Sequence, residues 1–260
     1  MTSSEKKQLQ ITACKVRMGV IESTYGAKAG HPGGSLSAAE VYTYLYFKEM
    51  NIDPKNPKWE DRDRFVLSKG HTTPGLYSVL ANRGFFPVED LPTFRHIDSY
   101  LQGHPNMNPV PGVDMSTGSL GQGISVATGM ALAAKHTGKA NRVYTLLGDG
   151  EIQEGQVWEA CMAAAHYKLD NLCVIVDKLV SFGFEVAAVD GHNFDELEAA
   201  FNKAKETKGK PFAIVMKTIK GKDVSFMEND AGWHGKAPND AEHEQAIKEL
   251  TAILNELEGK

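Results

Sequence analysis

Residues 144–177 read YTLLGDGEIQEGQVWEACMAAAHYKLDNLCVIVD, and this stretch decides the predicted fold. An apolar run over 143–147 predicts a short strand, a Gly-Asp-Gly turn follows it at 148–150, and a helix then leads to a second buried strand over 172–176. Two strands joined in this way are expected to be parallel, with a right-handed crossover. The Asp149 carboxylate would then lie at the carboxyl end of the first strand, where open α/β sheets bind ligands.

Asp149 stands between two glycines, which let the backbone turn tightly and approach a bulky ligand closely. A carboxylate in such a turn suits a hard divalent cation, and that kind of cation suits a diphosphate. Gly-Asp-Gly also occurs in plain strand-to-helix turns, so this motif alone leaves both interpretations open.

The bulk composition describes an ordinary globular chain of 260 residues, with 42% hydrophobic residues and a formal net charge of -5 at pH 7. Its mild acidity and the lack of a long Lys/Arg run give no reason to expect nucleic acid. No run of about 18 apolar residues predicts a membrane span, and the N-terminal MTSSEKKQLQ lacks the apolar core of a signal peptide. Three cysteines in apolar segments are expected to be buried free thiols of a cytoplasmic protein: Cys14, Cys161 and Cys173.

Strand and helix patterns alternate along the rest of the chain, without an internal repeat. Helical spacing of apolar residues predicts helices over 7–25, 38–49, 76–83, 194–205 and 241–257. Ser35 or Ser37 is expected to cap the helix at 38–49. Short apolar runs predict further strands over 65–67, 184–189 and 212–217. The alternation predicts an α/β fold: a doubly wound, mainly parallel sheet flanked by helices on both faces.

Four histidines lie in glycine- or proline-flanked loops, several of which follow predicted strands: His31, His71, His104 and His234. Any one of them alone is better interpreted as a surface or structural histidine. Parallel strands end at one edge of a sheet, so the loops are expected to converge there, where histidine can donate to phosphate or hydroxyl oxygens and shuttle protons. No HxxxH or CxxC spacing supports zinc, and no P-loop or Rossmann fingerprint supports nucleotide hydrolysis or hydride transfer.

Several motifs in one order carry a resemblance over nearly the whole chain: KAGHPGGSLSAAE, DRFVLSKGH, GHP followed by STGSLGQG, LLGDGEIQEGQVWEA, VDGHN, and KTIKG with WHGKAP. Together they closely resemble the N-terminal, thiamine-diphosphate-binding (PP) domain of transketolase. The resemblance implies one thiamine-diphosphate-binding domain over 1–260, with the pyrimidine-binding and C-terminal domains of a complete transketolase absent. The implied reaction moves a two-carbon ketol unit from a ketose phosphate to an aldose phosphate.

The resemblance also implies roles for individual residues. Asp149 is similar to the ligand of Mg²⁺ (or Ca²⁺) that anchors the cofactor diphosphate. Residues implied to contact the cofactor, or in the last case to meet the neighbouring subunit beside it, are His71, Gly118, Leu120, Gly150 and Glu154. Histidines implied to contact the sugar substrate or the diphosphate, and to assist proton transfer, are His31, His104 and His234.

In this family the cofactor lies between two domains from different subunits. The chain is therefore expected to need a separate C-terminal subunit carrying the activating glutamate, as in a split-gene transketolase, and to form a homodimer through the region 121–130. Two alternatives stay open. One is the subunit of another thiamine-dependent enzyme, such as a 1-deoxyxylulose-phosphate synthase or a dehydrogenase E1 alpha chain. The other is a cofactor-deficient, non-catalytic dimerising module.

The sequence departs from the family pattern directly after the second buried strand. The family continues there to an Asn that also ligates the metal, and then to a cofactor-covering loop and a helix. Here CVIVDK runs straight into LVSFGFEV, so Lys178 is followed by Leu179 and no Asn occurs over 172–189. Whether Asp177 replaces the Asn is open at this point. A metal shell left with Asp149 alone is expected to bind the diphosphate weakly.

Overall fold

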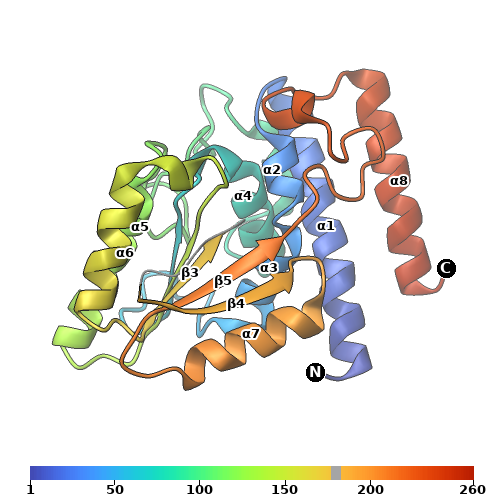
Figure 1. The fold of residues 1–260 in the computed structure, drawn as a ribbon. Helices are drawn as coiled ribbons and strands as arrows, with labels where there is room; N and C mark the ends of the chain where they lie inside the picture. The colour runs from blue at the N-terminus through green and yellow to red at the C-terminus, as the bar shows by residue number, and fades with distance from the viewer. Residues whose placement is uncertain (177–182) are drawn as a thin grey trace.

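The sheet is the centre of the fold in a computed structural model that describes residues 1–176 and 183–260 (Figure 1). All strand pairs in the described residues are parallel, in the order β1-β2-β3-β5-β4. The strands are β1 Arg64–Leu67, β2 Val143–Leu146, β3 Leu172–Val176, β4 Glu185–Asp190 and β5 Phe212–Lys217. The predicted α/β fold with a doubly wound parallel sheet is confirmed.

Helices and short turns connect these strands. The α-helices of the described residues are α1 Ser3–Ala27, α2 Pro32–Leu36, α3 Ala39–Tyr44, α4 Thr73–Arg83, α5 Gln122–His136, α6 Gly155–His166, α7 Phe194–Glu206 and α8 Asp240–Glu258. A π-helical turn extends α3 over Leu45–Glu49, and 3₁₀ turns occupy Gly70–Thr72, Val88–Thr93, Glu151–Gln153 and Ala231–His234.

Helix α2 is not predicted by the sequence pattern, because two of its five residues are glycines. It begins at Pro32, a residue suited to the first turn of a helix, directly after His31 as the N-cap. Ser35 therefore lies inside α2, where its hydroxyl donates to the carbonyl oxygen of His31 at 2.9 Å. Ala38 is the N-cap residue of α3, so the prediction that Ser35 or Ser37 caps that helix is wrong.

Each face of the sheet packs against its own set of helices. On one face α1, α3, α4 and α7 cover strand residues such as Phe65 and Ile175. On the other face α5 and α6 cover Val66 and Val174. Strand β3 is buried at every position, as expected for a parallel strand in the middle of a sheet. Helix α8 packs along α1, away from the sheet (Figure 1).

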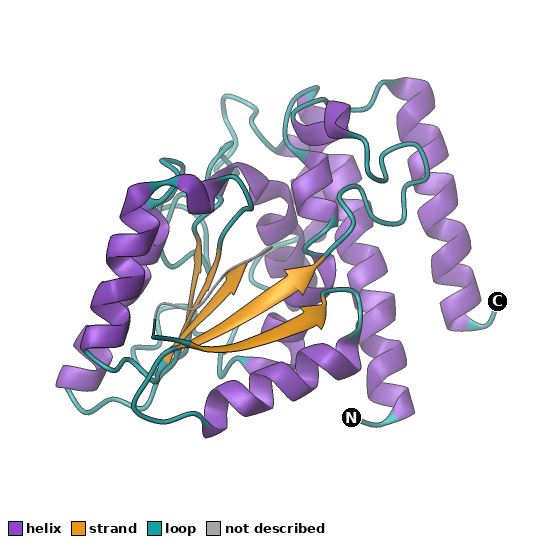
Figure 2. Ribbon diagram, viewed as in Figure 1, coloured by secondary structure: helices purple, strands orange, loops and turns teal. Residues whose placement is uncertain are grey.

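No helix of the described residues covers the α5–α6 side of the sheet over β4 and β5 (Figure 2). On that side Val215 pairs in register with Ala188, and Val215 is half-buried while Ala188 is exposed. Only eight residues separate Val176 from Glu185. A crossover between parallel strands normally takes a dozen or more residues and usually includes a helix. The uncovered face therefore coincides with the place where the sequence is short.

The three cysteines are buried and free, as predicted. In the described part of the chain, no helix has the length and apolar character needed to cross a membrane.

Two adjacent residues of β5 test the uncovered face. Ile214 is fully buried between the sheet and its helices, so Ile214→Ala should lower the free energy of unfolding by about 2–5 kcal/mol. Val215→Ala removes less buried surface and should cost under about 1 kcal/mol. Urea denaturation of both variants measures the difference. Equal losses would mean that the face is covered in solution.

Candidate active site

The candidate site lies at the edge of the sheet where the parallel strands end. Loops leave this edge after β1 (68–72), after β2 (147–150), after β4 (191–193) and after β5 (218–221). Because all the strands run in one direction, these loops gather polar residues from distant parts of the sequence, as at the ligand-binding edge of open α/β sheets.

Three of the four predicted histidines form one cluster at this edge. His71 lies in the 3₁₀ turn after β1, His31 is the N-cap of α2, and His234 ends the 3₁₀ turn before α8. The ring centroid of His31 is 5.0 Å from that of His71 and 5.4 Å from that of His234, and the centroids of His71 and His234 are 5.4 Å apart. The prediction that these histidines converge is confirmed by the distances, whereas their roles stay predictions.

His104 lies beside this cluster and against the backbone of Gly118. A Cβ atom added to Gly118 would come within 3.0 Å of the His104 ring, and Gly118 has φ of +155°. A larger residue would therefore meet both a steric and a conformational barrier at this position. Gly118, the first glycine of the STGSLGQG motif, thus allows the ring of His104 to approach the loop closely.

Burial and neighbouring charges lower the pKa values of three histidines at this edge, His71, His31 and His104. Burial, and then the neighbouring histidines and Lys69, lower the pKa of His71 to about 3. Burial followed by the charges of His234 and Arg95 lowers the pKa of His31. Burial and Arg95 also lower the pKa of His104. A neutral imidazole offers one donor and one acceptor, so each ring can bind a hydroxyl or exchange a proton with it.

Asp149 is the exposed carboxylate of the Gly-Asp-Gly turn, and it is paired with Lys220. The Lys220 ammonium donates to both carboxylate oxygens, at 2.9 and 3.2 Å. Burial raises the pKa of Asp149, but the hydrogen bond and charge of Lys220 outweigh it and lower the pKa. Sequence reasoning missed Lys220, which lies 71 positions away along the chain.

The residues around Asp149 supply only some of the groups that would bind a metal ion together with a phosphate-containing ligand. A Cβ atom added to Gly150 would have no neighbour within 4 Å, so the turn faces open space. In the described part of the chain no group of three or more His, Cys, Asp or Glu side chains could hold a metal ion. Mg²⁺ often uses one or two carboxylates together with water and phosphate oxygens, and Asp149 fits that limited role. Asp177 and the junction of Lys178 with Leu179 lie outside the described residues.

Glu151 joins three of the loops at this edge and was also missed from the sequence. Its side chain is buried and accepts hydrogen bonds from the Ser68 hydroxyl at 2.5 Å, the Gly121 N–H at 2.9 Å and the Gly148 N–H at 3.0 Å. The three donors belong to the loop carrying His71, to the start of α5 and to the Gly-Asp-Gly turn. The only sequence signal was an acidic residue directly after that turn.

The remaining predicted residues lie at the start of α5 and α6. Leu120 is 37% exposed in the loop before α5, and Glu154 is the exposed N-cap residue of α6. A Cβ atom added to Gly121 would come within 2.9 Å of Glu154 Cβ, so the two helix starts are in close contact. Both side chains are open to a neighbouring molecule, and their roles stay predictions.

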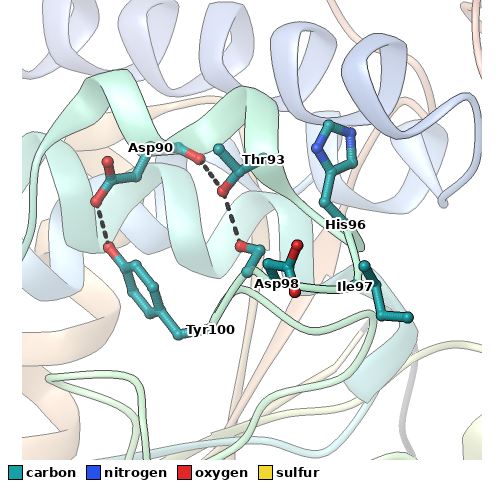
Figure 3. A pocket seen from close by; sticks show the side chains of 7 residues that line it. Asp90, Thr93, His96, Ile97, Asp98 and Tyr100 are labelled. Atoms are coloured by element: carbon teal, nitrogen blue, oxygen red, sulfur yellow. Dashed lines mark hydrogen bonds between the residues drawn. The ribbon is translucent and has the colours of Figure 1, made fainter.

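Two cavities differ in their relation to this site. One of about 790 Å³ joins the Gly-Asp-Gly turn to the uncovered face of β4 and β5, and Asp149, Lys220 and Val215 line it. The other, of about 670 Å³, lies under the loop at 96–100 and contains none of the predicted residues (Figure 3). Hydrogen bonds such as that from Tyr100 to Asp90, at 2.6 Å, hold its wall together.

The fold and the site together describe an α/β domain with a histidine cluster and an acidic glycine turn at the carboxyl edge of a parallel sheet, the edge at which open α/β sheets bind ligands. The family model for the thiamine-diphosphate-binding domain of transketolase matches residues 8–180 and 176–253. The chain therefore belongs to the transketolase family of transferase enzymes. The two matched segments meet where the sequence departs from the family pattern.

Individual relatives support the same assignment. A 6-deoxy-6-sulfo-D-fructose transketolase subunit of Clostridium sp. (strain MSTE9) is 42% identical over 269 residues, covering 95% of this chain and 98% of its own length. An apulose-4-phosphate transketolase subunit of Phocaeicola vulgatus is 39% identical, covering 96% of each chain. The crystal structure of a Campylobacter jejuni transketolase superposes with a TM-score of 0.86 at 31% identity, over 96% of this chain and 45% of that one. The alignment of 269 positions is longer than this chain, so the first relative has residues that this chain lacks.

Replacement of Glu151 tests its role in joining the loops. Glu151→Ala leaves three donors without their acceptor and should lower the free energy of unfolding by at least about 2 kcal/mol. Glu154→Ala is the matched control, since an exposed glutamate should change stability by about 0.5 kcal/mol or less. Chemical denaturation that gave equal effects for the two variants would contradict the assignment.

The lowered pKa of His71 predicts how stability depends on pH. The unfolded chain takes up the His71 proton near the ordinary histidine pKa of about 6.5, while the folded chain resists it down to about pH 3. Stability contributed by this histidine is thus complete above about pH 6.5 and decreases as the pH falls toward 3. Melting curves between about pH 7 and 4 should show a shallower decline for His71→Gln than for the unsubstituted chain. An equal decline in the two chains would contradict this role of His71.

Proposed function

We propose that the chain is the N-terminal subunit of a split-type transketolase, consisting of a single PP domain that binds thiamine diphosphate and acts with a separate C-terminal subunit. The observation that carries the proposal is the cluster of His31, His71 and His234 beside the Gly-Asp-Gly turn. The membership of the chain in the transketolase family supports thiamine diphosphate as the cofactor. The two subunit relatives are matched along 98% and 96% of their length, which supports a chain of this size working as a subunit.

The substrate class follows from the relatives and from the polar groups at the site. One relative is named for a sulfo-sugar and another for a sugar phosphate. Both compounds carry an anionic group, so we infer an anionic ketose as the two-carbon donor and an aldose as the acceptor. The Nδ1 atom of His31 is buried without a hydrogen-bond partner in the described residues, and a substrate or cofactor oxygen would satisfy it.

The chain's own residues would bind and orient the ligands. Neutral His31 and His104 would hold sugar hydroxyls and move a proton between ring nitrogen and hydroxyl oxygen. Four residues would line the cofactor: His71, Gly118, Leu120 and Gly150. Thiamine diphosphate, when bound, supplies the carbanion stabilisation that the transfer requires. Asp149 would hold Mg²⁺ beside the diphosphate, and the Lys220 ammonium next to Asp149 would add a positive charge toward the same group.

Assembly with other chains is part of the proposal. Leu120 and Glu154 lie exposed at the start of α5 and α6, where a second copy or the C-terminal subunit would cover them. A homodimer through 121–130 is the arrangement that the family resemblance favours.

A second candidate function is a non-catalytic dimerising module that has lost the cofactor. Two observations favour it: the family match is interrupted at 176–180, and Asp149 is paired with Lys220 rather than free. The two candidates differ in whether the chain responds to the cofactor.

Thiamine diphosphate with Mg²⁺ should raise the melting temperature of the chain, alone or mixed with a C-terminal transketolase subunit. At a ligand concentration of about 100 times Kd, the rise should be about 5–10 °C. Asp149→Ala should abolish the rise. Asp240→Ala is the matched control, because Asp240 is also an exposed aspartate paired with a lysine, Lys28, at 3.2 Å.

Isothermal titration of the same mixtures separates the two candidate functions. Binding that appears or strengthens with the C-terminal subunit supports the split enzyme. No binding in either mixture would reject the enzyme and leave the dimerising module.

A further inference from the structure

A network of buried charges lies beneath the candidate site and has no part in the function proposed above. The Arg17 side chain of α1 is 2% exposed, and its Nη2 atom donates to both carboxylate oxygens of Glu40 in α3, at 2.7 and 2.8 Å. Glu40 Oε2 also accepts from Nδ1 of His192, at 2.9 Å. His192 belongs to the loop after β4, in the VDGHN motif.

The second ring nitrogen of His192 fixes the next loop. Its Nε2 atom accepts the backbone N–H of Ile219 at 2.8 Å. Because an acceptor nitrogen carries no proton, the ring proton lies on Nδ1, which donates to Glu40. The imidazole therefore links a buried carboxylate on one side to the loop after β5 on the other.

Lys220 follows Ile219, and the backbone on both sides of it is held. The N–H of Gly221 donates to the carbonyl oxygen of Gly33 at 3.1 Å, and the carbonyl oxygen of Lys220 accepts the N–H of Asn229 at 3.0 Å. Arg17 reaches the same loop a second time, through Asp223 at 3.1 Å. The side chain of Lys220 is thereby directed at the Asp149 carboxylate.

A gain in the free energy of unfolding does not by itself explain a buried network of this kind. Burial raises the pKa of Glu40, but Arg17 and His192 outweigh burial and lower it to about 2. Replacing buried ion pairs with well-packed apolar residues is often neutral or stabilising, because desolvating the charges is costly. The network ends instead in a hydrogen bond to the backbone next to Lys220, and so fixes the position of the loop that carries this lysine.

We propose that Glu40 and His192 are positioning residues, which act together through the Ile219 N–H to hold Lys220 against Asp149. They would touch neither cofactor nor substrate. The functional meaning of this placement rests on the proposed function, because Asp149 is the group assigned to the metal and diphosphate. The placement of Lys220 itself does not depend on that assignment.

Chemical acetylation of Lys220, followed by mass spectrometry of its peptide, measures the placement without any ligand. The lysine should react about two- to fivefold faster once the ion pair with Asp149 is lost, as expected for a weak pair of partly exposed groups. The variants are Asp149→Asn, His192→Phe and the double substitution. Phenylalanine keeps the ring but loses both nitrogens. We expect each single substitution to accelerate Lys220 to the same extent and the double substitution to add nothing, because both act on one interaction.

Internal controls separate positioning from general loosening. Lys203 of α7 is paired with Glu185 of β4 at 2.9 Å, and its reactivity should be unchanged in every variant. His243→Phe is the matched control for His192→Phe and should leave the reactivity of Lys220 unchanged. His243 also contacts a glutamate, Glu22, at 3.2 Å, but it lies on α8. His192→Gln keeps a donor and an acceptor and should restore slow acetylation. Should His192→Phe fail to fold, Glu40→Gln should accelerate Lys220 in the same direction.

Unchanged Lys220 reactivity in His192→Phe, or equal acceleration of Lys203, would overturn the proposal. The response to thiamine diphosphate with Mg²⁺ gives a separate result. A melting-temperature rise that is present in the unsubstituted chain but reduced in His192→Phe supports the functional meaning. Absence of the rise in the unsubstituted chain rejects the proposed function and leaves the acetylation result to decide the positioning.

Discussion

The carboxylate of Glu151 is the interaction on which the arrangement of the candidate site depends. It is buried and accepts from Ser68, Gly121 and Gly148, three donors that lie far apart in the sequence. Each donor belongs to a loop that would otherwise leave the sheet edge independently. A charge-assisted acceptor shared among backbone N–H groups is stronger than a neutral one and leaves little freedom in the loops that it joins. The predicted cofactor residues can therefore keep their mutual positions before any ligand arrives.

The parallel arrangement of the strands brings together the loops that Glu151 then holds in place. In a parallel sheet every strand ends at the same edge, so His71, Asp149 and the loop of Lys220 are neighbours although they follow β1, β2 and β5. Burial first, and then the neighbouring histidines, lower the pKa values of His71 and His31, and neutral rings suit hydroxyl groups better than a field of positive charge would. The positive charge of Lys220 at this edge is paired with Asp149.

Local pattern was enough to predict the sheet almost strand by strand, because buried parallel strands are short apolar runs, and β3 and β5 were placed with their observed bounds. The position of several histidine loops after predicted parallel strands also predicted that the histidines converge. It did not predict Glu151, Lys220 or His192 as contact residues, since each acts across a long sequence separation that local pattern does not encode. Helix α2 was missed for a different reason. Its glycines oppose helix formation locally, and the packing of Gly33 against Trp233 overrides that preference.

The short connection after β3 bears on the surroundings of Asp149. With eight residues between Val176 and Glu185, the chain falls short of the usual length of a parallel crossover, and no helix of the described residues covers the face of β4 and β5 beside Asp149. The family match is interrupted at the same place, and one relative has additional residues in its alignment. The side chains of Asp149 and Lys220 are both partly exposed at this turn. Exposure weakens electrostatic contacts, so the fixed placement of Lys220 gains importance as a source of charge at this turn.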